Sequence, residues 1–144
     1  MKKMLILFVT LIVGQTVISQ EKLTDLKLEY QAISRGSFEK MTLTKDVMFY
    51  SDDRGKKTTA TVNLSEKQWD KVNRLVNQIK LKELPYLKAP SDKRKYDGAA
   101  HGQLKITFKD RVYESSGFDH GNPPLEIKNL VDYIISLSQS GKKD

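Results

Sequence analysis

The chain has 144 residues, of which 30% are charged, and a formal net charge of +7 at pH 7. It contains no cysteine, which excludes disulfides, thiolate metal sites and the thiol of a bacterial lipid anchor. Basic residues are scattered, with their densest cluster at Lys93-Arg94-Lys95, and they lack the continuous basic face with interleaved aromatics that indicates a nucleic-acid partner.

The first residues have the layout of a secretory signal peptide. A basic start, Lys2-Lys3, precedes an apolar run over residues 4–13, and Ser19 ends a plausible cleavage site. The apolar run is shorter than a membrane-spanning helix, and no later segment approaches that length. We therefore expect export to the periplasm or the exterior after cleavage near Ser19, with no transmembrane segment in the mature domain, residues 20–144.

Four stretches between residues 26 and 64 are typical of β-strands. Apolar and polar side chains alternate along most of them with period two, as in a strand that buries one face. Turn-forming sequences such as Arg35-Gly36-Ser37 separate the stretches. The pattern predicts an antiparallel meander with strands over about 26–32, 38–44, 47–50 and 58–64.

The next stretch predicts an amphipathic helix. Ser65 and Gln68 match a capping box, and apolar residues then recur at helical spacing from Trp69 to Ile79. Pro85 prevents a regular continuation of the helix. A long link over residues 88–102 follows, of a length that is usually functional or disordered in a small domain.

The last third of the chain predicts a hairpin and a second helix. Alternating stretches over residues 104–108 and 112–115 form the hairpin, which bends at Asp110-Arg111. Asn122 is placed to cap a helix that has Pro123 at its first position and an apolar stripe as far as Leu137. From about residue 138 we expect a frayed polar tail.

These elements predict an α+β fold in one domain, with two helices on one face of an antiparallel sheet that combines the four-strand meander and the later hairpin. The opposite face of the sheet is then polar. It could meet a partner, although such a face is more often only solvated. Its expected members are Lys27, Glu29, Lys40, Thr42, Thr59, Thr61, Lys105 and Thr107.

The hairpin also predicts a candidate ligand-binding corner. Because its strands are antiparallel, the residues before the first strand and after the second lie at the same end. Tyr96, Asp97 and His101 should therefore approach Asp119 and His120. In the structural alternative, Asp119 accepts amides of its own turn and His120 bonds a backbone carbonyl.

The same corner is a candidate metal site. His101, Asp119 and His120 together offer two imidazoles and a carboxylate, which suit zinc or another divalent ion, although no His-Glu-x-x-His spacing is present. Ser115 and Ser116 stand close by in the sequence, but no Gly-x-Ser-x-Gly motif accompanies them, so a serine hydrolase is not indicated. No cofactor motif is present, and we expect no cofactor.

Two stretches carry a resemblance to other proteins. With Tyr96-Asp97-Gly98-Ala99 and Phe118-Asp119-His120-Gly121-Asn122-Pro123-Pro124, the chain resembles small exported proteins of Bacteroidetes bacteria that are known as domains of unknown function. The resemblance implies a periplasmic or secreted setting and a compact α+β domain, and it implies no activity.

Three functions are consistent with these observations. The first is a non-enzymatic binding or inhibitor-like module of the bacterial envelope, which meets a protein or another envelope component through the polar sheet face or the corner. The alternative is a metal-assisted hydrolase built on His101, Asp119 and His120. The third is a structural role in the envelope without a small ligand.

Overall fold

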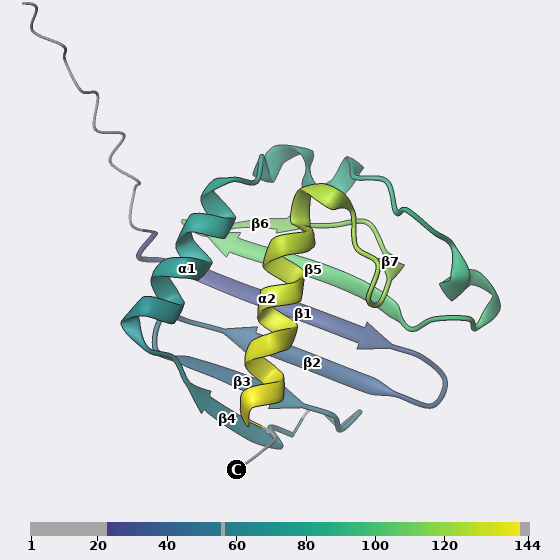
Figure 1. Cartoon of the computed structure of the whole chain (residues 1–144), viewed down its shortest axis with the longest axis horizontal. Coiled ribbons are helices and arrows are strands. Elements are labelled where there is room, and N and C mark those ends of the chain that lie inside the picture. The colour runs from purple at the N-terminus through teal and green to yellow at the C-terminus, as the bar shows by residue number, and fades with distance from the viewer. Residues whose placement is uncertain (1–22, 56, 142–144) are drawn as a thin grey trace, which may run out of the picture.

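One antiparallel sheet, covered on one side by two helices, makes up the described part of the chain (Figure 1). The structure, a computed structural model, describes residues 23–55 and 57–141, so the predicted signal peptide lies outside it. The α+β class is thereby confirmed. The elements are β1 (Leu26–Ile33), β2 (Phe38–Leu43), β3 (Val47–Ser51), β4 (Ala60–Asn63), α1 (Glu66–Asn77), the 3-10 helices η1 (Leu81–Tyr86) and η2 (Lys93–Tyr96), β5 (His101–Phe108), β6 (Arg111–Glu114), β7 (Phe118–Asp119) and α2 (Leu125–Gly141).

The strands lie in the order β4-β3-β2-β1-β5-β6, and the short strand β7 also pairs with β5. The predicted meander is β1 to β4, and the predicted hairpin is β5 and β6. The hairpin joins the meander along β1, which places β1 in the middle of the sheet. Lys109 and Asp110 make the two-residue turn with φ angles of 48° and 61°, and such left-handed turns match the twist of a hairpin.

Helix α1 begins where the sequence places it. The Ser65 hydroxyl accepts the Gln68 amide at 3.2 Å, and the Gln68 side chain accepts the Ser65 amide at 2.8 Å. This reciprocal pair satisfies two amides that have no partner within the helix. Trp69, Val72 and Val76 then form the buried stripe that packs on the sheet.

Helix α2 differs from its prediction at both ends. It begins at Leu125, two residues later than capping by Asn122 would give, and the Asn122 side-chain amide donates to Ser91. The expected fraying is wrong for residues 138–141, since the helix continues to Gly141 and Ser138 is buried, and the rest of the predicted tail lies outside the described residues. The Ser138 and Ser140 hydroxyls donate to carbonyls three residues earlier, so these polar side chains are satisfied within the helix.

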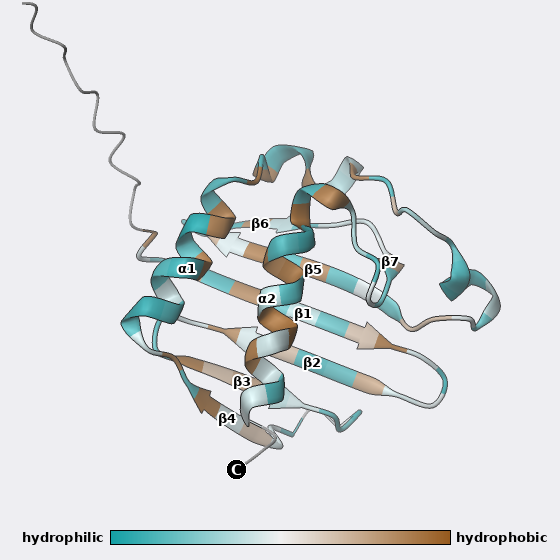
Figure 2. Cartoon of the chain, in the orientation of Figure 1, coloured by the Kyte–Doolittle hydropathy of each residue, from teal (hydrophilic) through white to brown (hydrophobic). Residues whose placement is uncertain are grey.

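The core lies between the sheet and the two helices. Apolar positions on both helices and on the central strands supply it (Figure 2). Within the described residues, no helix is both long and apolar enough to cross a membrane. The largest fully buried side chains include Tyr30, Phe118, Leu28, Met41, Leu104 and Ile134.

The other face of the sheet carries no helix, and polar residues lie on it in straight rows. One row crosses six strands, because the residues concerned are paired in register from each strand to the next. Side chains of paired residues lie on the same face. The row consists of Thr61, Phe49, Thr42, Glu29, Lys105 and Glu114.

Candidate functional site

The predicted corner forms in the backbone. His101 pairs with Asp119 where β5 meets β7, and the His120 amide donates to the Ala100 carbonyl at 2.9 Å. The strand β7 that makes this contact was not predicted, because two residues are too few for a period-two pattern. As predicted, the hairpin therefore brings the main chain before β5 close to the main chain after β6.

The side chains of the two histidines diverge. His101 precedes Gly102, which is buried on the helix side beneath Phe118 and Tyr30. Since successive strand residues point to opposite faces, His101 lies on the helix-free side, where it is exposed. His120 instead approaches the core, and its Nδ1 atom lies 2.8 Å from the Tyr30 hydroxyl oxygen. The expectation that the imidazoles share one site is therefore wrong.

Asp119 is buried in a hydrogen-bond network of its own. Its carboxylate accepts the Ser91 hydroxyl at 2.5 Å, the Lys93 amide at 2.8 Å and the Arg94 amide at 2.9 Å. The Arg94 guanidinium adds a bond at 3.1 Å. Burial alone would raise the pKa of the Asp119 carboxyl, but Ser91, the two amides and Arg94 together hold this pKa well below its usual range.

This network makes Asp119 a structural anion. The structural alternative is right in kind, since Asp119 accepts backbone amides, but these belong to η2 and not to its own turn. The two amides lie in the first turn of η2, where a helix has no internal partners for its N–H groups. The hydrogen bonds to the carboxylate come from Ser91, Lys93 and Arg94, so Asp119 fastens the start of η2 and the residues just before it to β7.

The remaining members of the corner lie apart from these groups. The Tyr96 side chain is 71% exposed, and Asp97 forms an exposed ion pair at 3.5 Å with Arg35. Among residues 23–55 and 57–141, no three His, Asp or Glu side chains gather in a way that could hold a metal ion. His101, Asp119 and His120 therefore occupy three different environments, and no shared metal site results.

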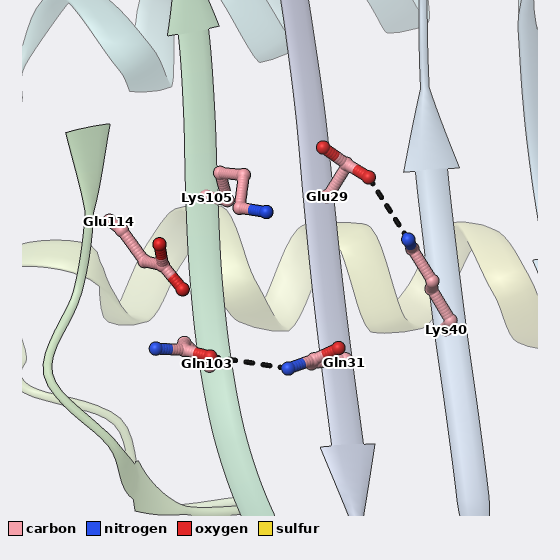
Figure 3. Close-up of a pocket in the computed structure, with 6 residues that line it drawn as sticks. All are labelled: Glu29, Gln31, Lys40, Gln103, Lys105 and Glu114. Carbon is pink, nitrogen blue, oxygen red and sulfur yellow. Dashed lines mark hydrogen bonds and ion pairs between the residues drawn. The ribbon is translucent and has the colours of Figure 1, made fainter. Parts of the chain in front are cut away.

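The helix-free face has a small polar pocket at its centre (Figure 3). Its volume is about 20 Å³, enough for about one water molecule. Figure 3 shows its side chains on the side of the sheet opposite α2, with Lys105 pointing toward β1. The lining residues are Glu29, Gln31, Lys40, Gln103, Lys105 and Glu114.

Hydrogen bonds and ion pairs join the residues of this pocket across the strands. Glu29 forms an ion pair with Lys40 on the neighbouring strand β2 at 3.0 Å. It forms a second ion pair with Lys27, on its own strand β1, at 3.5 Å. Gln31 donates to Gln103 at 3.2 Å. Partial burial would raise the pKa of Glu29, but the bond from Lys40 and the nearby lysines lower it. The centre of the face is thus an ordered array of charges and amides.

A second hollow, which we call the His101 groove, lies beside the corner. It is an open groove of about 580 Å³ with His101 and Gly117 among its lining residues. An ideal Cβ atom on Gly117 would lie 2.2 Å from His101 Nε2, so the imidazole rests directly against the glycine backbone. The full lining is Leu87, Lys88, Ala89, Asp92, Arg94, Lys95, His101, Ser116 and Gly117.

Sequence reasoning missed part of both hollows. Gln103 and Glu114 were not assigned to the polar face, although the same period-two alternation places Gln103 there. Lys88 joins the His101 groove only because the segment after η1 folds back past the end of β5, and no local pattern predicts that path.

Comparison of the chain with models of known protein families and with curated proteins yields no match. The function must therefore be inferred from the surfaces of the molecule itself.

Proposed function

We propose that this protein is a non-enzymatic binding module of the bacterial envelope that docks a partner protein on its helix-free sheet face. The observation that carries the proposal is the shape of this face. Its central pocket admits only about one water molecule, far below the 300–1,000 Å³ or so of typical small-molecule sites. A face whose central hollow is this small suits a macromolecule better than a small molecule.

The chemistry of the face supports a protein as the partner. Glu114, Lys105 and Glu29 alternate in charge along one row across neighbouring strands, which is a pattern that a partner can match with opposite charges. Such complementarity mainly provides specificity and rapid association. Because Glu29 is already held by Lys40 and Lys27, the array needs little reordering when a partner binds.

Apolar anchors flank the charged centre. Phe49 belongs to the same row and is 41% exposed, and Val112 on β6 is 59% exposed. Val112 pairs with Thr107, which pairs with Lys27, so it also lies on the helix-free face. Exposed aromatic residues near a polar array are typical sites of concentrated binding energy.

A binding comparison with matched variants tests this proposal. The immobilised mature protein is incubated with envelope proteins of the source organism, alongside a face variant, Phe49→Ser with Lys105→Glu. A helix-side control, Leu125→Ser with Lys67→Glu, makes the same chemical changes at exposed positions away from the face. We expect a partner that the wild type and the control retain and that the face variant loses, with at least about a 100-fold weaker Kd once the partner is purified.

The contrary results are equally specific. A partner that binds the face variant as tightly as the wild type would show that docking occurs elsewhere. Catalytic turnover that persists in the face variant and requires a metal would favour the hydrolase alternative. Circular dichroism of both variants checks that they remain folded.

A further inference from the structure

The His101 groove differs from the sheet face in size and in charge. At about 580 Å³ it falls within the volume range of small-molecule sites. Its lining contains the basic side chains of Lys88, Arg94 and Lys95 with a single carboxylate, Asp92. We propose that this groove binds a small organic anion, that is, a molecule bearing a carboxylate, sulfate or phosphate group.

The positive charge of the groove is only partly compensated. Asp92 is shared between Arg94 and Lys95, with both ion pairs at 3.2 Å. Arg94 also pairs with the buried Asp119 at 3.1 Å, so two carboxylates face the three cations of the lining, and the excess charge lies on Lys88. Among the described residues no ion pair involves Lys88, which is exposed at the rim. A hollow lined by an excess of one charge concentrates its field and attracts ions of the opposite sign.

Arg94 is held in position for this role. Its guanidinium donates to the Ser91 carbonyl at 2.7 Å and to Asp119 at 3.1 Å, and its side chain is only 12% exposed. Asp119 also accepts hydrogen bonds from a hydroxyl and two amides. The Arg94 guanidinium is therefore only one of several donors that stabilise the negative charge of Asp119. A planar guanidinium that is already oriented loses little freedom when it meets an oxyanion.

The groove also offers apolar surface to the body of a ligand. Leu87 and Ala89 belong to its lining together with Gly117. The His101 imidazole, whose Nε2 edge rests against Gly117, supplies a further polar side chain to the lining. The groove thus combines apolar contact with convergent polar groups, as small-molecule sites do.

The test uses three anions on one sugar body: glucuronate, glucose 6-sulfate and glucose 6-phosphate, with glucose as the neutral control. Binding to the mature protein is measured by calorimetry and by the perturbation of backbone amide signals in NMR. We expect at least one anion to bind and glucose not to bind, with perturbed amides at residues 87–89, 101 and 116–117. Which of the three binds most tightly identifies the oxyanion.

Two double variants decide whether the groove is responsible. Lys88→Gln with Lys95→Gln removes two charges from the groove, and Lys67→Gln with Lys82→Gln removes two exposed charges elsewhere. We expect the first pair to weaken binding at least about tenfold and the second to leave it unchanged. Equal weakening by both pairs, perturbed amides elsewhere, or no binding by any anion up to about 10 mM would overturn the proposal.

This inference does not depend on the proposed protein partner. The groove variants leave Phe49 and Lys105 unchanged, and the face variant leaves the groove residues unchanged, so either proposal can fail while the other stands.

Discussion

Asp119 shows how one residue with apparent catalytic chemistry can serve the fold instead. Its carboxylate is 2% exposed and accepts bonds from Ser91, Lys93 and Arg94. Both oxygens of the carboxylate are thus already hydrogen-bonded. These donors lower the pKa of the Asp119 carboxyl, so the shift is explained without a role in proton transfer.

We expect Asp119→Asn to destabilise the protein by about 3 kcal/mol. The substitution removes the negative charge opposite Arg94 and turns an amide group of the new side chain toward donors, which leaves buried groups unsatisfied. The free energy of unfolding in urea measures the loss. Asp92→Asn is the matched control, and because the Asp92 side chain is 58% exposed it should cost less than about 1 kcal/mol. Equal effects of the two variants would contradict the structural role of Asp119.

Gly102 makes a second prediction for a single residue. A Cβ atom at this position would lie 2.9 Å from the Phe118 ring and 3.1 Å from the Tyr30 hydroxyl, and both rings are fully buried. We expect Gly102→Ala to cost about 1–3 kcal/mol by overpacking the core. Gly36→Ala, where nothing lies within 4 Å of the new atom, should be nearly neutral in the same unfolding experiment. A neutral Gly102→Ala would mean that the rings move aside freely.

At the scale of the elements, helices α1 and η2 are capped at their N-terminal ends in different ways. Helix α1 contains its own capping box in Ser65 and Gln68. The 3-10 helix η2 has no side-chain hydrogen bond from its N-cap residue Asp92, and Asp119 supplies the acceptor from a distant strand. The first arrangement is visible in a four-residue sequence window, whereas the second exists only when β7 and η2 meet.

We expect Ser65→Ala to destabilise the protein by about 1 kcal/mol, because the Gln68 amide loses its acceptor at the helix start. Thermal unfolding followed by circular dichroism measures the change. Ser136→Ala removes a hydroxyl that bonds only within α2 and should change stability by less than about 0.5 kcal/mol. If the two substitutions have the same effect, the cap does not stabilise α1.

For the whole molecule, the ionised carboxyls set the response to acid. Asp119 and Glu29 both have pKa values below their ordinary values of 3.8 and 4.5. A group of this kind binds fewer protons in the folded state, so its contribution is complete above the ordinary pKa and is lost as the pH falls toward the folded value. The stability of the wild type should therefore be steady down to about pH 4.5 and then decline.

The urea midpoint between pH 7 and pH 2.5 measures this decline. In Asp119→Asn the acid limb should be shallower than in the wild type, because one of the two shifted carboxyls no longer titrates. Ser136→Ala, which removes no ionisable group, should keep the slope of the wild type. A wild-type midpoint that is the same at pH 3 and pH 7 would contradict the ionised state of Asp119.

The two faces of the sheet give the two sides of the molecule different surfaces. The helices bury most of one face, while the other face retains an ordered array of charges with Phe49 and Val112 exposed near it. The two proposals concern surfaces of different scale, the helix-free face for a macromolecule and the His101 groove for a small anion. Their separation allows each proposal to be tested alone.

The elements and the fold class could be predicted from sequence because their signals are local. Period-two alternation marks a strand wherever one face is buried, as in Leu28, Tyr30 and Ala32. A capping box and an apolar stripe likewise depend on a few neighbouring residues. The frayed end at residue 138 was predicted wrongly because serine hydroxyls can bond within their own helix, which composition does not reveal.

The sequence alone determined which residues could share a face and which ends of the strands would meet. Only the tertiary structure decided where the side chains at that meeting point, His101, Asp119 and His120, are directed. The reason is physical, since strand pairing brings main chains together, but His120 follows Asp119, the partner of His101, and successive side chains leave on opposite faces. Each side chain then takes the partner that the fold brings to it. Asp119 met the amides of η2, His120 met Tyr30, and His101 was left facing the open groove.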